Sequence, residues 1–268
     1  MIAIAHFIAV SFYLGAAAVA ALPFARRVKA PVIPVVVLLL LGIGAHATAL
    51  AGLTKQAGAA SLTGLGPALS FAGLVLALSL VIVEVLAREV SLTLVAAPLA
   101  ALVTMAGNLT GMHPFLEPQG ARAVWLTMHI VLSFIGIAAY ATAAAAGAMY
   151  LVARRELKSA HFGAIFRFFP PLDTLDRVNH VASIAGFLGL TLGLALAAAY
   201  SFQYRALVLP QIIWGLGAWG GVSALALGRI LRGWQARRAA IMSAVTFASV
   251  IALYVVFRMV SLNRGQFL

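Results

Sequence analysis

Six histidines are the residues of this sequence best suited to chemistry inside a protein. A neutral imidazole binds metal ions, iron among them, and exchanges protons near neutral pH. The sequence contains no cysteine, which excludes disulfides, thiolate metal sites, thiol redox chemistry and a CxxCH motif for covalent haem attachment. The candidate ligands are therefore imidazole nitrogens, at positions His6, His46, His113, His129, His161 and His180.

The spacing of these histidines favours haem iron over zinc. No two of them lie three or four residues apart, and no acidic residue stands close to His46 or His129. A zinc site would need about four protein ligands, or three and a water. Haem needs one or two axial ligands and a large apolar cleft, which a sequence so rich in apolar residues can supply. If these histidines bind a metal, their spacing therefore favours non-covalently held haem iron over zinc.

The composition places the histidines in a membrane protein. Apolar residues make up 64% of the 268 residues and charged residues only 9%, against roughly 45–50% and about 25% in soluble domains. Eighteen Lys and Arg against six Asp and Glu give a net charge of +12. The basic residues stand between apolar runs, where they meet anionic lipid head groups. The lipid bilayer is therefore an expected partner, and nucleic acid is not.

Apolar runs of about 20 residues predict transmembrane helices. We expect eight, at residues 2–22, 31–53, 66–86, 90–107, 123–151, 176–200, 208–228 and 239–261. The longest connection, residues 152–175, is too short to hold a soluble domain, so we expect a single transmembrane domain over residues 1–268. The expected fold class is all-α, a polytopic membrane bundle of eight helices.

Lysine and arginine set the expected orientation of this bundle. The first, third, fifth and seventh connections hold 12 of the 18 basic residues. The even connections hold only Lys55, Arg122 and Arg205. Because loops rich in Lys and Arg stay in the cytoplasm, both termini are expected outside.

This orientation places two histidines at a similar depth. His46 lies roughly 10 Å and His129 roughly 9 Å from the outer ends of their spans, at about 1.5 Å per residue. On two helices of one bundle they could ligate a haem iron from opposite sides. The other histidines are expected closer to the membrane faces: His6 and His113 near the outer face, and His161 and His180 near the inner face. His6, His113 and His180 are additional candidates for cofactor binding. The competing interpretation is that each membrane histidine hydrogen-bonds a neighbouring helix.

The acidic residues near the predicted helices have structural explanations. Glu84 stands four residues before Arg88, a spacing that predicts an ion pair along one helix. Asp173 is expected to cap the helix that begins near residue 176, and Asp176 to add negative charge to its first turn. No paired carboxylates remain in the middle of the membrane, which disfavours a proton pump or a cation channel.

Several segments resemble the cytochrome c assembly proteins of the CcsA/CcmC type. Residues 125–140, WLTMHIVLSFIGIAAY, are similar to the W-L-x-x-H-x-x-x-x-L-S-Y segment of that family. The stretch LDRVNHVASIAGFLGLTLGLALAAAY at 175–200 and a basic RGWQARR turn before the last span follow in the family's order. The eight-helix layout and HATAL at 46–50 resemble the shorter HemX/YpjD branch. The likeness covers most of the chain and is strongest from about residue 120 onward.

The resemblance implies a haem-handling protein of cytochrome c or tetrapyrrole biogenesis. It implies a place in the bacterial plasma (inner) membrane, other assembly proteins as partners, and His129 as an axial ligand of haem b near the outer face. The synthases of the family carry a WGxxWxWD loop. Here the corresponding region reads SFQYRALVLP, and the nearby WGLGAW contains no acidic residue. The synthases' histidine after the last helix is also missing, so the departures favour a protein that does not attach haem as an enzyme.

Three functions stay open at this point. The first is a haem-binding or haem-transferring protein with His129 and His46 as axial ligands of the iron. The second is a non-catalytic assembly factor or subunit that retains the fold without haem. The third is a small-molecule transporter, for which no inverted repeat is found.

Overall fold

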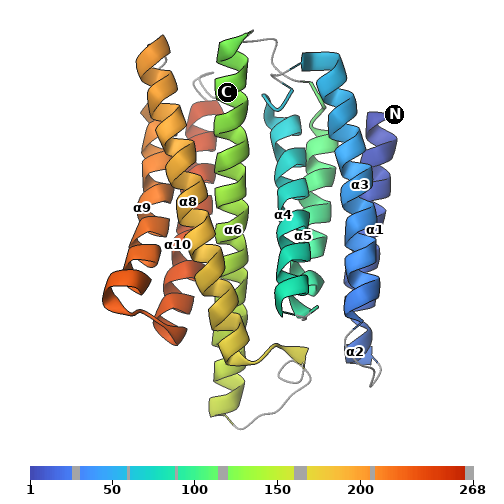
Figure 1. The fold of residues 1–268 in the computed structure, drawn as a ribbon, viewed down its shortest axis with the longest axis vertical. Coiled ribbons are helices and arrows are strands. Elements are labelled where there is room, and N and C mark those ends of the chain that lie inside the picture. The colour runs from blue at the N-terminus through green and yellow to red at the C-terminus, as the bar shows by residue number, and fades with distance from the viewer. Residues whose placement is uncertain are drawn as a thin grey trace. The chain divides into compact units, whose positions relative to one another are not determined.

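The computed structural model describes residues 1–25, 31–58, 61–87, 90–113, 120–159, 168–205 and 209–262. Across these residues the regular structure is entirely helical. The helices are α1 (Ile2–Ala20), α2 (Leu22–Ala25), α3 (Val32–Ala57), α4 (Leu65–Ala87), α5 (Ser91–Leu109), α6 (Ala121–Lys158), α8 (Leu172–Tyr204), α9 (Leu209–Arg232) and α10 (Ala236–Leu262) (Figure 1). The prediction of an all-α membrane bundle is confirmed.

Seven of the described helices are long and apolar enough to cross a membrane, namely α1, α3, α4, α5, α6, α8 and α10. The eighth predicted span, 208–228, corresponds to α9, which has 24 residues. Within its described residues, α9 is less apolar than the seven other helices and is not among the candidate spans. Its glycines and the arginines of its last turn lower the mean hydropathy. An eighth span and the outward position of both termini stay predictions.

Two helices extend well beyond the predicted apolar runs. α6 continues to Lys158, and its last turns hold basic side chains whose charge is favourable at the negative end of a helix dipole. α8 begins at Leu172, so Asp173 lies in its first turn and the expectation that it caps the helix is wrong. The segment expected to carry His161 along the inner interface lies outside the described residues.

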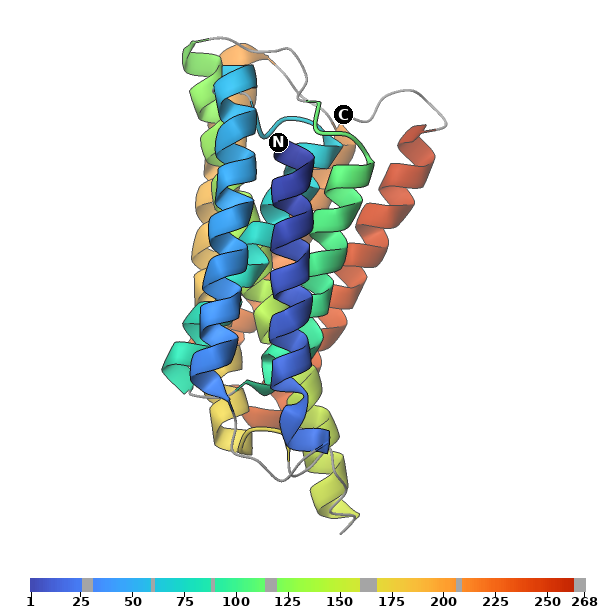
Figure 2. The same ribbon diagram turned by 90° about the vertical axis from the view of Figure 1, so that its right-hand side faces the viewer.

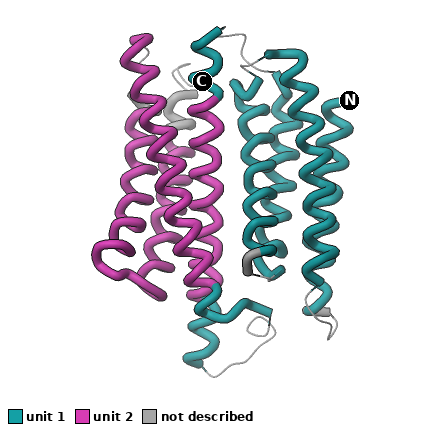
Figure 3. Tube along the Cα trace, viewed as in Figure 1, with its two compact units in different colours: residues 1–127, 152–174 teal, residues 128–151, 175–268 magenta. Residues whose placement is uncertain are grey.

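The helices divide into two compact units (Figure 3). Unit 1 comprises residues 1–127 and 152–174, and unit 2 comprises residues 128–151 and 175–268. α6 therefore contributes its two ends to unit 1 and its middle to unit 2. The expectation of a single domain over residues 1–268 stays a prediction.

Unit 1 is built from a ring of four helices. α1 packs against α3 and α5, and α4 packs against the same two helices (Figure 2). Small residues let α4 and α5 approach closely, because a Cβ added to Gly66 would lie 2.9 Å from the carbonyl oxygen of Gly107. Such contacts are the usual way in which membrane helices pack, since lipid offers no hydrophobic driving force between them. The interior of the ring includes Tyr13 and Leu39, both fully buried.

Unit 2 packs the middle of α6 with α8, α9 and α10. Its core includes Tyr140 from α6, Leu190 from α8, Leu225 from α9 and Ala239 from α10. α6 and α8 touch through glycines, because a Cβ added to Gly189 would lie 2.8 Å from the Cα of Gly136. This close contact brings the backbone of α8 within reach of the polar side chains of α6.

Candidate functional site

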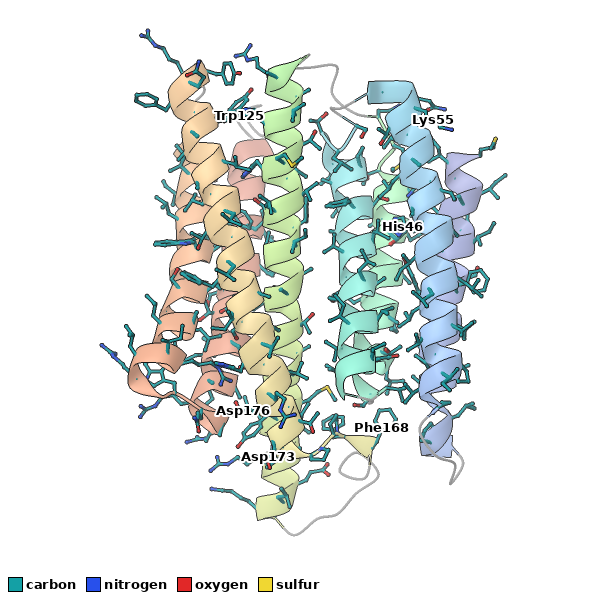
Figure 4. The ribbon with its side chains drawn as sticks, viewed as in Figure 1. His46, Lys55, Trp125, Phe168, Asp173 and Asp176 are labelled. Atoms are coloured by element: carbon teal, nitrogen blue, oxygen red, sulfur yellow. The ribbon has the colours of Figure 1, made fainter. Side chains whose placement is uncertain are left out.

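His46 lies on α3 and is completely buried inside unit 1 (Figure 4). Its Nδ1 is 3.1 Å from the hydroxyl of Tyr13 on α1, and its Nε2 is 2.8 Å from the hydroxyl of Ser70 on α4. Gly42, one turn before His46, makes room for the tyrosine, because a Cβ added there would lie 2.6 Å from the Tyr13 ring. Both ring nitrogens of His46 are therefore engaged by other side chains.

His6 belongs to the same buried group of polar side chains. Its Nε2 is 2.7 Å from the Ser70 hydroxyl, and its Nδ1 is 2.9 Å from the carbonyl oxygen of Ile2. The ring centroids of His6 and His46 lie 5.1 Å apart in an edge-on arrangement. The sequence placed both histidines in the outer half of the membrane on different helices, and the structure joins them through one serine. We call His6, Tyr13, His46 and Ser70 the His–Ser–Tyr cluster.

His129 lies on α6 within unit 2 and is half-buried. Its Nδ1 is 2.8 Å from the carbonyl oxygen of Gly193 on α8. A carbonyl oxygen can only accept, so Nδ1 carries the ring proton and donates it. The Ser133 hydroxyl, one turn away, lies 3.4 Å from the same nitrogen, at the long limit for a hydrogen bond. In a neutral ring Nε2 then keeps its lone pair, and within the described residues it has no hydrogen-bond partner.

Glycines of α6 and α8 make this contact between His129 and the backbone of α8 feasible. A Cβ added to Gly193 would lie 2.5 Å from the Ser133 hydroxyl, and one added to Gly136 would lie 2.6 Å from the backbone nitrogen of Leu190. A larger residue at either position would push α8 away from α6. The GLTLG stretch of α8 therefore serves to hold a backbone carbonyl beside the imidazole of His129.

The remaining candidate histidines join neither group. His113 follows the end of α5 and is exposed, and His180 is exposed on α8. His46 and His129 belong to different units, so their pairing across one iron stays a prediction.

An ion pair joins α8 to α9 in unit 2, and the sequence did not predict it. Nη2 of Arg229 donates to Oδ1 of Asp176 at 2.7 Å, with the arginine side chain 3% and the aspartate side chain 25% exposed. The same aspartate oxygen accepts the backbone N–H of Ala236, the first residue of α10, at 3.1 Å. Asp176 (labelled in Figure 4) thus caps α10. The expectation that it lies in the first turn of its own helix is wrong, because α8 begins at Leu172 and only Asp173 is acidic in that turn.

Asn179 extends this contact to α6 and to the interior of α10. Its Oδ1 accepts from Arg229 at 2.5 Å, and its Nδ2 donates to the Ala143 carbonyl and to the Ser243 hydroxyl at 2.6 and 2.7 Å. One amide side chain therefore binds groups from three helices. We call Asp176, Asn179, Arg229 and Ser243 the Asp–Arg clasp.

Glu84 is fully buried near the end of α4. Neither of its carboxylate oxygens has a hydrogen-bond partner within the described residues. Arg88, the expected partner, lies outside those residues, so the predicted ion pair stays a prediction. No group of three or more His, Asp or Glu side chains in the described ranges is arranged to hold a metal ion.

Comparison with known proteins gives one match. The model of the family described as Cytochrome C assembly protein matches residues 62–263, about three quarters of the chain. The match begins just before α4, so it includes His113, His129 and His180 but leaves His6 and His46 outside. Neither the search of curated proteins nor the search of solved structures found a match.

Proposed function

The chain belongs to the cytochrome c assembly protein family, and on this basis we propose that it binds haem in the membrane through His129 and passes it on. Membership in the family gives a haem-related membrane function in cytochrome c biogenesis. Binding and transfer of haem by this chain go beyond family membership and are our proposal. The assignment of the chain to the HemX/YpjD-like branch is part of the same proposal.

The geometry of His129 is the observation that supports this proposal. An axial ligand needs one bare imidazole nitrogen, and histidines that bind metals almost always donate the other N–H to a carbonyl or carboxylate. His129 combines both features, because its Nδ1 faces the Gly193 carbonyl at 2.8 Å and Nε2 has no partner within the described part of the chain. The residues present therefore fit one axial position of a haem iron.

His46 is not part of the proposed binding site. To bind iron it would have to give up its contact with Tyr13 or with Ser70, each of which engages one of its two ring nitrogens. It also lies outside the segment that matches the family. The proposal therefore rests on His129 alone in this chain.

Each residue near His129 has a defined task in this proposal. When bound, haem supplies an iron centre that accepts the Nε2 lone pair of His129. Gly193 holds the ring in the tautomer with a bare Nε2, and Gly136 and Gly189 keep α8 close enough for that contact. With no cysteine in the sequence, the haem is held without a covalent bond, as haem b is.

The proposed setting is the bacterial plasma (inner) membrane, where other cytochrome assembly proteins would receive or deliver the haem. The proposed role is haem handling without enzymatic attachment. The WGxxWxWD loop that is typical of the synthases is missing where α8 ends and α9 begins, since residues 201–210 read SFQYRALVLP.

The haem content of the purified protein tests the proposal. Protein from cells supplied with haem precursor is expected to show a Soret band, and acidic acetone is expected to extract the pigment completely. His129→Ala is expected to lower haem per folded protein at least tenfold. His180→Ala is the matched control, because His180 is an exposed histidine of the same unit, and it should retain the haem.

Two outcomes would contradict the proposal. If the wild-type protein carries no haem under these conditions, the chain is an assembly factor that retains the fold without the cofactor. If His129→Ala lowers the yield of folded protein but leaves haem per folded molecule unchanged, His129 is a packing residue between α6 and α8.

A further inference from the structure

The His–Ser–Tyr cluster forms a continuous chain of hydrogen bonds in the interior of unit 1. The contacts run from the Tyr13 hydroxyl to His46, from His46 to Ser70, from Ser70 to His6 and from His6 to the Ile2 carbonyl, at 3.1, 2.8, 2.7 and 2.9 Å. All four side chains are at most 1% exposed. They come from three helices, α1, α3 and α4, so the chain exists only in the folded unit.

The last member of this chain fixes the position of every proton in it. The Ile2 carbonyl can only accept, so His6 carries its proton on Nδ1 and its Nε2 must accept from the Ser70 hydroxyl. Ser70 has a single proton, so it accepts from Nε2–H of His46. Nδ1 of His46 is then bare and accepts from Tyr13. The two histidines are therefore in opposite tautomers, and all four hydrogen bonds point toward the start of α1.

Both rings are neutral in this arrangement. Neither histidine has a carboxylate partner in the described part of unit 1, and an imidazolium without such a partner is costly in the hydrocarbon region. Each ring then has one N–H that donates and one bare nitrogen that accepts, and both nitrogens of each ring make a hydrogen bond. A chain of groups that both donate and accept, aligned in one direction, is what proton transfer along hydrogen bonds requires.

We propose that the His–Ser–Tyr cluster is a proton relay between Tyr13, inside unit 1, and water at the start of α1. In the outward step Tyr13 gives its proton to Nδ1 of His46, and Nε2 of His46 gives its proton to Ser70. Ser70 then gives its proton to Nε2 of His6, and Nδ1 of His6 releases its proton to water when its hydrogen bond to the Ile2 carbonyl opens. The reverse step returns a proton to the tyrosine oxygen, so no other reactant is needed.

The position of the relay supports an exit at the start of α1. Ile2 is only half-buried, and the start of α1 is expected at the outer membrane face, so water at that face is the expected proton acceptor at the His6 end. Tyr13 lies 11 residues further along α1, or about 16 Å at about 1.5 Å per residue. The relay therefore reaches roughly half of the way through a hydrocarbon core of about 30 Å.

This inference is independent of the proposed haem site. His6, Tyr13 and His46 precede the segment that matches the family, and the hydrogen bonds that join them lie within unit 1. A failure of haem binding would leave the relay untouched, and a failure of the relay would leave the role of His129 open.

The test uses the full chain, labelled with 15N histidine and reconstituted in lipid, and measures two properties by solid-state NMR. The first is the tautomer of each buried ring, which is expected to be Nε2–H for His46 and Nδ1–H for His6. The second is the rate at which deuterium from D2O replaces the Nε2 proton of His46. His46→Asn and His6→Asn identify the two sets of signals.

Ser70→Ala separates a relay from a static contact between helices. Loss of the serine breaks the relay, so exchange at His46 should slow by at least tenfold. A static contact predicts the opposite sign, because removing Ser70 would loosen the packing and speed exchange. Ser11→Ala is the matched control on α1, since its exposed hydroxyl donates to the Phe7 carbonyl of the same helix, and it should leave the rate unchanged.

Tyr13→Phe gives a second variant in case Ser70→Ala does not fold. It removes the group that gives a proton to Nδ1 of His46 when Nε2 releases its own, so exchange at Nε2 of His46 should slow by at least tenfold. The relay is wrong if both histidines have the same tautomer, or if either Ser70→Ala or Tyr13→Phe leaves exchange at His46 unchanged or speeds it.

Discussion

Replacing Asp176 with Asn is expected to destabilise unit 2 by about 3 kcal/mol. The aspartate neutralises Arg229, whose side chain is only 3% exposed. Two unit charges about 4 Å apart interact by about 4 kcal/mol at an effective dielectric constant of about 20, and removing one partner of a buried pair costs about 3–5 kcal/mol. The lower end applies here, because Asp176 is 25% exposed and Asn179 still accepts from Arg229.

A second substitution tests whether the unpaired charge causes this loss. Adding Arg229→Met to Asp176→Asn removes the buried cation, so the double variant should recover at least about 1 kcal/mol relative to Asp176→Asn alone. Asp173→Asn is the matched control, because Asp173 is an exposed aspartate near the start of the same helix. Its effect should stay within about 0.5 kcal/mol, as for most surface substitutions.

The assay is reversible unfolding of the purified protein in mixed micelles, with sodium dodecyl sulfate as the denaturant and helix content followed by circular dichroism. The reasoning would be refuted if Asp176→Asn were as stable as Asp173→Asn. It would also be refuted if Arg229→Met made the Asp176→Asn protein less stable, because the arginine would then contribute more through packing than its charge costs.

Further predictions concern helix packing and orientation. Gly189→Ala is expected to lower the free energy of unfolding by about 1–3 kcal/mol, because the added Cβ would lie 2.8 Å from the Cα of Gly136. Gly44→Ala is the control and should not destabilise the protein, because nothing lies within 4 Å of its added Cβ. Unfolding in mixed micelles compares the two variants, and equal stability would contradict the close packing of α6 and α8. Reporter fusions after residues 30, 156 and 235 are all expected to be cytoplasmic, and a periplasmic signal from two of them would overturn the predicted orientation.

The helices could be predicted from the sequence because each apolar run is close to the length that spans a bilayer. The predicted span 2–22 corresponds to α1 at Ile2–Ala20, and 90–107 to α5 at Ser91–Leu109. Apolar content does not mark where a helix ends in water, so the last turns of α6 were missed. It also could not show that α8 begins before Asp173, which depends on the backbone rather than on hydropathy.

The partners of the candidate residues could not be predicted in the same way. His129 stood out as a histidine inside a predicted span, but its partner is a backbone carbonyl, and any residue of a neighbouring helix offers one. Ser70 and Tyr13 are 24 and 33 residues from His46, and only the packing of three helices brings them together. Asp176 was interpreted as a favourable charge near the start of its own helix, because its position in the sequence is typical of that role. Its actual partner is Arg229 on α9, which the sequence spacing does not indicate.

Rescue of a His129→Gly variant by free imidazole tests the central claim most directly. The glycine variant removes the proposed ligand and leaves a space that imidazole can enter from solution. The account predicts that His129→Gly purifies without haem and that added imidazole, together with haem, restores the Soret band and a stoichiometric haem content. Full haem content in His129→Gly without imidazole would contradict the account, because the iron would then be held by another residue.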